Sequence, residues 1–260
     1  MKTLDKSHIA TYIQSFITEN TFSSNLQQAI LYSTGGKFFR SQLVYALGQD
    51  LQLNQNNLDS MGIAIELLHT STLIHDDLPC MDNDNYRRQK PSCHRQFNEA
   101  TAVLSGDTLQ ALSFLALSQA PNLNADMVQV LANSSKNLCF GQSLDLMHTA
   151  RSVSEHLNII ELKTSALMIA CFRLPSMLKL SQNDSISLSR AGHHLGLAFQ
   201  LQDDLKDSKD DPNSITHILS IDEINSMISK EFKACYQLID QYLPQSIKTK
   251  ELIQKIQARS

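Results

Sequence analysis

The segment HDDLPCMDND contains the residues with the most evident chemistry, the aspartates Asp76, Asp77 and Asp82. It follows an apolar run, MGIAIELLHTSTLI, whose spacing predicts a buried helix. Pro79 should end that helix near Leu78, because proline lacks a backbone donor and clashes with the preceding turn. Asp82 can then turn back toward Asp76, and the carboxylates would form an oxygen-rich cluster suited to Mg²⁺. Taken alone, these residues would equally fit a solvated acidic loop.

A second aspartate cluster, in FQLQDDLKD, weakens the acidic-loop explanation. It comprises Asp203, Asp204 and Asp207 and ends another apolar-periodic run, AGHHLGLAFQLQ. Asp203 and Asp207 are spaced i,i+4, so they share one face of a helix. Two acid clusters that end two buried helices predict facing carboxylates at the mouth of a helical bundle, a known place for metal sites. A surface acidic patch is the less favoured alternative.

Cationic residues near the acids favour a polyanionic substrate. Arg87 and Arg88 follow the first cluster, and their planar guanidinium groups suit phosphate oxygens. Lys163 and Thr164 lie in an otherwise apolar run, NIIELKTSALMIA, where a lysine needs an anion or must snorkel to water. Solvated loop arginines and a snorkelling lysine are the plain alternatives.

The rest of the chain supplies helices to position these residues. Only 8 glycines and 6 prolines occur in 260 residues, and apolar residues recur at spacings of three and four. We predict an all-α fold, a bundle of about ten helices that forms a single domain over 1–260. Three N-terminal helices precede seven predicted segments: 57–78, 94–120, 124–148, 153–173, 184–207, 220–242 and 245–258.

Bulk properties exclude several classes of protein. The net charge of −4 argues against nucleic acid as a partner. The five cysteines show no CxxC spacing, so we expect reduced thiols in a cytoplasmic protein rather than a zinc site or a disulfide framework. We expect no signal peptide, because MKTLDKSHIATYIQSF lacks a long apolar core and a small-residue cleavage site. We expect no transmembrane segment, because no apolar run approaches about 18 residues.

Several motifs together resemble one known family. They are DDLPCMD followed by RR, KPSCH and FNEATAVLSGDTLQ, then KTSALM and FQLQDDLKD. In this order they resemble the bacterial short-chain trans-isoprenyl diphosphate synthases, the farnesyl and geranylgeranyl diphosphate synthases of the polyprenyl synthetase group, from about Gly35 to Asp207. The resemblance implies an isoprenoid synthase-like bundle with a central cavity, a homodimer, and Mg²⁺ as cofactor, with three ions once substrate is bound.

The activity that the resemblance implies is head-to-tail prenyl transfer between isopentenyl diphosphate and an allylic diphosphate, dimethylallyl or geranyl. The allylic diphosphate ionises at C1, the double bond of isopentenyl diphosphate attacks the cation, and a proton is lost. Metal ions and fixed cations must stabilise the charge on the leaving diphosphate. Farnesyl diphosphate is the expected product. Geranylgeranyl diphosphate stays open, because Ser71 and Thr72 are small where bulky residues of the family stop chain growth.

The resemblance also assigns roles to individual residues. Three aspartates would bind Mg²⁺ directly: Asp76, Asp82 and Asp203. Three would act through coordinated water or from behind the direct ligands: Asp77, Asp204 and Asp207. Arg87 would contact the allylic diphosphate and Arg88 the isopentenyl diphosphate. Lys163 and Thr164 would steady the allylic diphosphate and the developing cation.

Further residues match the isopentenyl diphosphate site of the family: Lys37, Arg40 and His69. His69 lies seven residues before Asp76, two helical turns, and therefore on the same side of that helix; a packed core histidine is the plain alternative. Gln200 and Gln142 could offer amide dipoles to the cation, although Gln142 fits a polar helix position equally well.

The sequence departs from the family pattern at several positions. The motif GGKRxRP reads GGKFFRS, so that Phe38 replaces a cation and Ser41 a proline. Gln89 stands where glycine is usual after the arginine pair. The loop SKDDPNS after the second cluster is short and keeps only Lys209, which should weaken charge screening and water exclusion over the diphosphates.

These departures motivate an alternative function. The favoured reading is an active prenyltransferase, and the alternative is a catalytically weak or inactive homologue that acts as a regulatory or binding subunit. A terpene cyclase is a further alternative. A histidine–aspartate metal phosphohydrolase is least favoured, because it would leave the second aspartate cluster unexplained.

Overall fold

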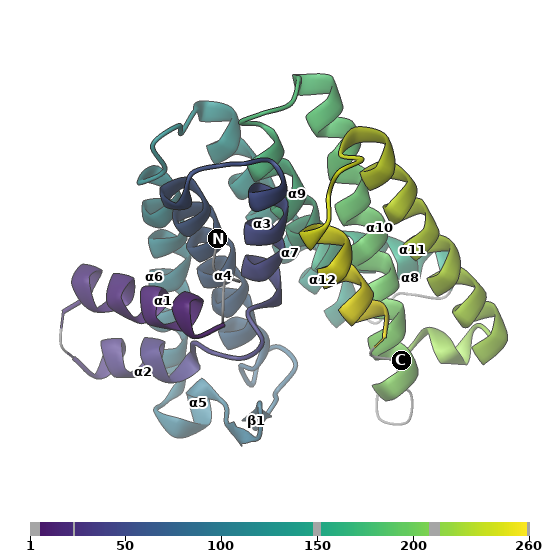
Figure 1. Cartoon of the computed structure of the whole chain (residues 1–260). Helices are drawn as coiled ribbons and strands as arrows, with labels where there is room; N and C mark the ends of the chain where they lie inside the picture. The colour runs from purple at the N-terminus through teal and green to yellow at the C-terminus, as the bar shows by residue number, and fades with distance from the viewer. Residues whose placement is uncertain (1–5, 23, 148–151, 208–213, 259–260) are drawn as a thin grey trace. The chain divides into compact units, whose positions relative to one another are not determined.

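The computed structural model describes residues 6–22, 24–147, 152–207 and 214–258, and in these ranges the chain is mostly α-helical (Figure 1). The all-α prediction is confirmed, with twelve α-helices in the described part where about ten were expected. The helices are α1 Lys6–Asn20, α2 Asn25–Ser33, α3 Phe39–Asp50, α4 Gln55–Asp76, α5 Cys93–Gln96, α6 Glu99–Ser118, α7 Ala125–Leu146, α8 Val153–Ile160, α9 Ala166–Ser176, α10 Gln182–Asp207, α11 Ile221–Tyr242 and α12 Lys248–Gln257.

Shorter elements interrupt the helices. A two-residue antiparallel hairpin pairs β1, Tyr86–Arg87, with β2, Lys90–Pro91. A π-helix, η1 over Glu161–Ser165, lies between α8 and α9, and a 3₁₀ turn, η2 over Ile215–His217, precedes α11. The predicted helix 153–173 is therefore three successive helical segments rather than one.

Capping explains where several helices begin. The predicted helix 94–120 divides because Asn98 caps α6, its side chain accepting a hydrogen bond from the backbone N–H of Thr101. The start of α11 follows the prediction closely, because Ser220 and Glu223 form a capping box in front of it.

The chain forms two compact units, and the single domain expected from the sequence stays a prediction. The first unit comprises 1–45 and 54–128. Its centre is the pair α4 and α6, on which α1, α2 and α5 pack. A Cβ at Gly106 on α6 would collide with the imidazole of His75 on α4, so glycine permits this close approach. His75 also contacts the carbonyl of Val103 at 3.0 Å, which accounts for it as a packing residue.

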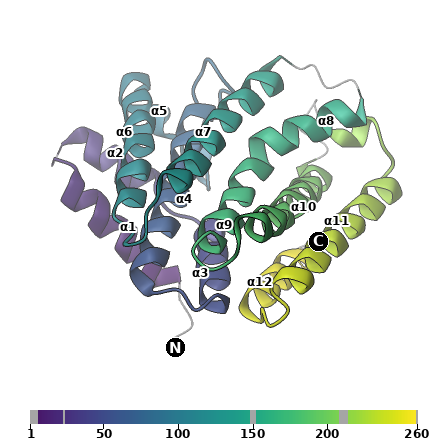
Figure 2. The same cartoon turned by 90° about the horizontal axis from the view of Figure 1, so that it is seen from above.

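The second unit comprises 46–53 and 129–260. Its centre is α10, which packs on α9 and η1 and also on α11 (Figure 2). Two glycines of α10 lie against backbone: a Cβ at Gly192 would be 2.5 Å from the carbonyl oxygen of Met168, and one at Gly196 would be 2.6 Å from the Cα of Ser165. This close packing fixes α10, and with it the second aspartate cluster, against η1.

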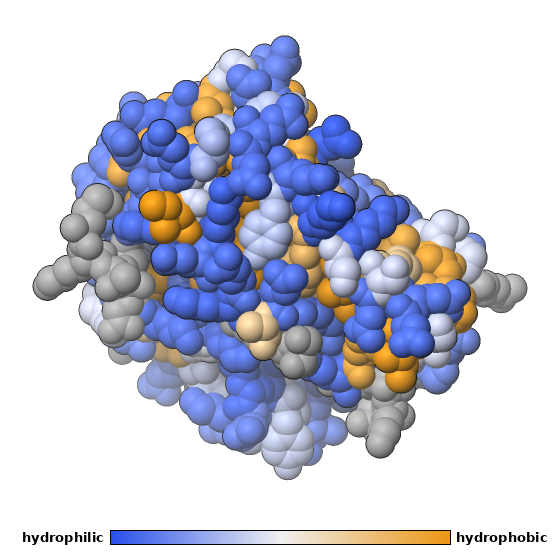
Figure 3. All heavy atoms as spheres, turned by 45° about the vertical axis from the view of Figure 1, so that its right-hand side comes forward, coloured by the Kyte–Doolittle hydropathy of each residue, from blue (hydrophilic) through white to orange (hydrophobic). Residues whose placement is uncertain are grey.

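One helix departs from the expectation about membranes. By length and composition α6 could span a membrane, and the sequence prediction did not take it into account. The helix packs against α4 and α2 inside the first unit, and core helices of soluble proteins pass the same test. On the face shown in Figure 3, hydrophilic residues predominate and hydrophobic residues form small patches.

Candidate active site

The first aspartate cluster lies where α4 ends. The helix stops at Asp76, two residues before Leu78, and Asp77 is its C-cap. The backbone N–H of Asp82 donates to the carbonyl of Asp76 at 2.9 Å, so the loop containing Pro79 returns to the helix end as predicted. Asp76 is half-buried and Asp82 exposed. Among the described residues no group of three or more histidine, cysteine or acidic side chains is arranged to hold a metal ion. Any Mg²⁺ there would need oxygens from substrate and water, which is how this ion usually binds.

Asp77 is buried and paired with Arg87. The guanidinium Nε donates to Asp77 Oδ1 at 2.9 Å, Nη2 also contacts this oxygen, and Nη2 donates to Asp84 Oδ2 at 2.8 Å. Burial raises the pKa of Asp77, and the charge of Arg87 offsets part of that rise. Asp77 therefore holds Arg87 in place, which agrees with a role behind the direct metal ligands.

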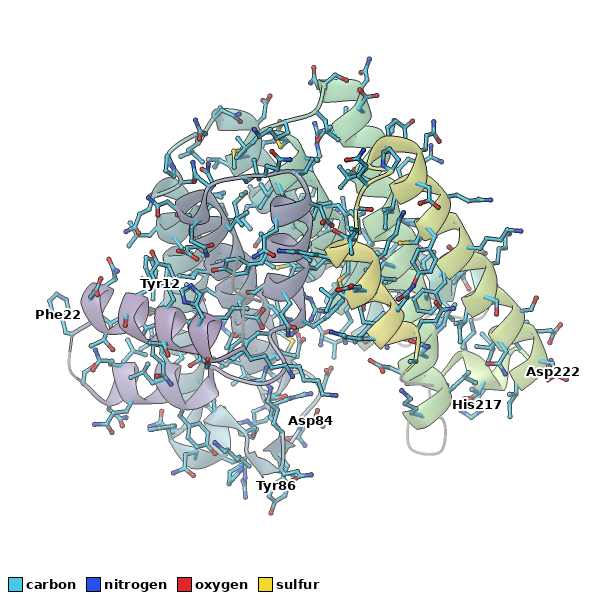
Figure 4. The ribbon with its side chains drawn as sticks, in the orientation of Figure 1. Tyr12, Phe22, Asp84, Tyr86, His217 and Asp222 are labelled. Atoms are coloured by element: carbon cyan, nitrogen blue, oxygen red, sulfur yellow. The ribbon has the colours of Figure 1, made fainter. Side chains whose placement is uncertain are left out.

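The hairpin after the acids presents the second arginine. Arg88 and Gln89 form its turn with φ of +55° and +64°, the left-handed pair typical of a type I′ turn. Arg88 Nη1 donates to the carbonyl of Ser33 at 3.1 Å, and its guanidinium lies over Gly36, where a Cβ would be 2.8 Å from Nε. Figure 4 labels Tyr86, which belongs to β1 of this hairpin, and Asp84 shortly before it.

A cavity of about 270 Å³ opens beside the hairpin within the first unit. Its lining includes the glycine pair Gly35 and Gly36, both arginines of the hairpin, and Asp77. Three residues predicted for isopentenyl diphosphate, Lys37, Arg40 and His69, do not line it. Arg87 and Arg88 are thus the predicted phosphate-binding residues that border this space.

Arg40 and His69 lie together, as the resemblance implies. Arg40 Nη1 is 3.0 Å from His69 Nε2, and since the guanidinium only donates, Nε2 accepts and the imidazole is neutral. Burial lowers the pKa of His69 well below 6.5, and the charges of Arg40, Arg88 and Arg87 lower it further. Lys37 is exposed. Arg40, His69 and Arg88 thus share one electrostatic environment, which suits an anion.

Sequence reasoning missed the buried partner of this cationic group, Glu66. The Ser41 N–H is 3.3 Å from Glu66 Oε2, and Ser41 Oγ lies 3.1 Å from the same oxygen and 2.7 Å from the carbonyl of Gly62. Burial raises the pKa of Glu66, while Arg40 and Ser41 offset part of the rise. A lone acid in the apolar run MGIAIELL, three residues before His69, was the available signal. Phe38, which belongs with Ser41 to the motif GGKFFRS, is buried and has φ +48°.

In the second unit, a hydrogen-bonded chain connects Thr164, Gln200, Asp204 and His156. Thr164 Oγ1 donates to Gln200 Oε1 at 2.9 Å, and Gln200 Nε2 donates to Asp204 Oδ1 at 2.9 Å. Asp204 Oδ2 lies 2.9 Å from Nε2 of His156, a residue that sequence reasoning missed. Both Asp204 oxygens thus have protein partners. Asp203 is half-buried, and the side chain of Asp207, like Lys209, lies outside the described residues.

Lys163 lies in the π-helix η1, a feature that often marks functional sites. Its Nζ donates to Asp145 Oδ2 at 2.6 Å, and both side chains are partly exposed. Gly141 brings α7 against η1, since a Cβ there would be 2.5 Å from the backbone nitrogen of Lys163. Gln142 is buried. Asp145, three residues after Gln142, was also missed; only its acidic character in FGQSLDL signalled it.

Ser71 and Thr72 are satisfied within their own helix. Ser71 Oγ donates to the carbonyl of Leu68 at 2.7 Å, and Thr72 Oγ1 to the carbonyl of His69 at 2.9 Å. Because their hydroxyls bond to the backbone, both residues present only small side chains from α4. Their effect on product length stays a prediction.

Comparisons with known proteins give one consistent result. A family model described as polyprenyl synthetase matches residues 23–255. A farnesyl diphosphate synthase of Haemophilus influenzae is 43% identical over 203 residues, 73% of this chain and 69% of that protein. One of Buchnera aphidicola is 44% identical, covering 72% of each chain. The crystal structure of a geranyltransferase from Legionella pneumophila superposes with a TM-score of 0.88 at 34% identity, over 98% of this chain and 94% of that one.

Proposed function

The chain belongs to the polyprenyl synthetase family, and we propose that it condenses isopentenyl diphosphate with an allylic diphosphate to make farnesyl diphosphate. The similar proteins named as farnesyl diphosphate synthases support this product over geranylgeranyl diphosphate. They give no support to the alternative of a non-catalytic subunit.

The observation that carries the proposal is the loop at the end of α4. The hydrogen bond from Asp82 to Asp76 returns an acid to the helix end, next to a hairpin that carries Arg87 and Arg88. Acids beside paired arginines suit a diphosphate bound with Mg²⁺. Carboxylate oxygens are the ligands that this ion prefers, so the residues at both clusters fit it. Asp76 and Asp82 at the first cluster, and Asp203 at the second, would be direct ligands of Mg²⁺, which when bound would neutralise charge on the leaving diphosphate.

Each side chain then has its own role in the proposed reaction. Arg87 and Lys163 bind the allylic diphosphate, which takes the electron pair of the C1–O bond as that bond breaks. Thr164 and Gln200 direct oxygen dipoles toward the cation left on the allylic carbon. The double bond of isopentenyl diphosphate attacks this carbon to form the new C–C bond, and loss of one proton restores a double bond.

The second substrate needs a separate anion site. Arg40, His69 and Arg88 support its binding, because the neutral imidazole of His69 contacts Arg40 at 3.0 Å and lies within the influence of the charges of Arg40 and Arg88. Lys37, exposed in the preceding loop, adds a further cation. We also expect a cytoplasmic homodimer, from family resemblance alone, and light scattering of the purified protein tests the dimer.

The deciding experiment is incubation of the purified chain with Mg²⁺, labelled isopentenyl diphosphate and dimethylallyl or geranyl diphosphate. We expect a labelled C15 diphosphate. A C20 product would correct the product assignment. Release of diphosphate without a condensation product would favour a terpene cyclase, and no turnover with either primer would favour the binding subunit.

A further inference from the structure

His156 is the member of the hydrogen-bonded chain in the second unit to which the sequence assigned no role. It lies on α8, 48 positions before Asp204 on α10, and their side chains are 10% and 6% exposed. A carboxylate can only accept, so the proton must lie on His156 Nε2, which donates to Asp204 Oδ2 at 2.9 Å. His156 thereby holds one oxygen of Asp204 in place.

The other oxygen of Asp204 determines which way the Gln200 amide points. An amide has one accepting and one donating end, and Asp204 Oδ1 can only bond the donating end, Nε2, at 2.9 Å. Gln200 Oε1 therefore faces Thr164, whose hydroxyl donates to it at 2.9 Å. If the amide were reversed, Nε2 would face Thr164 and Oε1 would meet the carboxylate, two oxygens repelling each other.

We propose that His156 is a positioning residue: it fixes Asp204, which holds Gln200 with its oxygen toward Thr164. Asp204 then acts on the orientation of a reacting-site dipole rather than as a ligand of Mg²⁺. The inference rests on the proposed function, in which Gln200 and Thr164 direct dipoles to the cation. A preorganised dipole matters most where charge develops in the transition state, so loss of His156 should lower kcat and leave substrate affinity nearly unchanged.

Two substitutions separate the hydrogen bond from the volume of the side chain. His156→Leu removes the donor, and we expect kcat to fall by about 10- to 100-fold, as for residues that orient the ligands of a metal. KM for isopentenyl diphosphate and the Mg²⁺ concentration for half-maximal rate should stay close to those of the unmodified protein. His156→Gln places an amide N–H at similar reach and should recover most of the rate. His194→Leu is the matched control, because it breaks another short histidine–acid contact, 2.6 Å to Glu231, in the same unit.

A double mutant tests the path through Gln200. If His156 acts only by holding the amide, His156→Leu combined with Gln200→Ala should be no slower than Gln200→Ala alone. Additive losses would overturn the proposal. So would a large rise in the Mg²⁺ requirement, which would return Asp204 to the metal, or equal losses in His156→Leu and His156→Gln.

A measurement without turnover separates this inference from the proposed function. In the ¹⁵N spectrum of His156→Leu, the side-chain amide signal of Gln200 should move to a different chemical shift, and its protons should exchange faster with water. Neither change is expected in His194→Leu. An unchanged amide signal would overturn the positioning role even if the enzyme were active. If the unmodified chain transfers no prenyl group but the amide responds as expected, the proposed function fails and the positioning role stands.

Discussion

Two buried aspartates, one in each unit, are held in opposite ways. Asp77, after α4, is neutralised by the charge of Arg87, whereas Asp204, on α10, receives hydrogen bonds from a neutral amide and an imidazole. Pairing with Arg87 keeps a cation at the first cluster, and the hydrogen bond with the Gln200 amide fixes a direction at the second. A buried charge pair is vulnerable when one partner is lost. In a hydrogen-bonded chain, loss of one member changes the orientation of the others.

The largest effect should come from the aspartates proposed to bind Mg²⁺ directly, rather than from Asp77 or Asp204. Asp76→Ala or Asp203→Ala should lower turnover by several orders of magnitude, because each removes a proposed Mg²⁺ ligand, while the melting temperature hardly changes. Steady-state kinetics and thermal melts check both parts. A melting temperature of the unmodified protein that Mg²⁺ with a bisphosphonate fails to raise would contradict metal binding at these acids.

Removing the charge of Arg87 tests the contrast between Asp77 and Asp204. Arg87→Met should destabilise the fold by about 2–3 kcal/mol, below the range for fully buried pairs because Arg87 is partly exposed. Because the pKa of Asp77 is already raised in the folded chain, ionisation of this carboxyl lowers the free energy of unfolding as pH rises. Arg87→Met raises that pKa further, so urea unfolding should show a larger loss at pH 8 than at pH 5. Asp204→Asn is the control and should change stability by less; equal losses would remove the contrast.

A smaller effect should follow from His69. Its pKa lies well below 6.5 in the folded chain, so below about pH 6.5 the unfolded chain binds a proton that the folded chain does not. Stability should therefore fall as pH decreases from 7 to 5. His69→Gln removes this component, so its stability should fall less over the same range in urea unfolding. An identical pH dependence in the variant would mean that His69 titrates normally.

The smallest effect should come from the hairpin turn. Gln89 has φ +64°, where side chains with a Cβ are strained, so Gln89→Gly should stabilise the protein by about 1 kcal/mol. Gln89→Ala keeps the Cβ and should show no gain. Thermal or urea unfolding of both variants measures the difference. A gain in the alanine variant would point to the side chain rather than the backbone.

Local signals carried most of what the sequence could predict. Pro79 predicted both the end of α4 and the return of Asp82, because proline acts on its immediate neighbours. The division of 94–120 at Asn98 was missed, although a capping asparagine is a local signal too. The π-helix η1 was missed because its residues have the same apolar spacing as the helices around it.

Partners far apart in sequence could not be found in this way. Ser41 and Glu66 are separated by 25 positions, Lys163 and Asp145 by 18, and His156 and Asp204 by 48. Each pair depends on packing between elements, which a single sequence does not reveal. The residues that carry the chemistry thus stay a prediction from the sequence, and the structure adds the partners that hold several of them.

The number of residues in the π-helix η1 sets the direction in which the side chains of the preceding helix α8 point. A π-turn holds one residue more than a regular helical turn. Deleting Leu162 would restore an unbroken α-helix, and the segment before it would rotate by about 100° about its axis. His156 would then face away from Asp204, even though every residue of the hydrogen-bonded chain were still present.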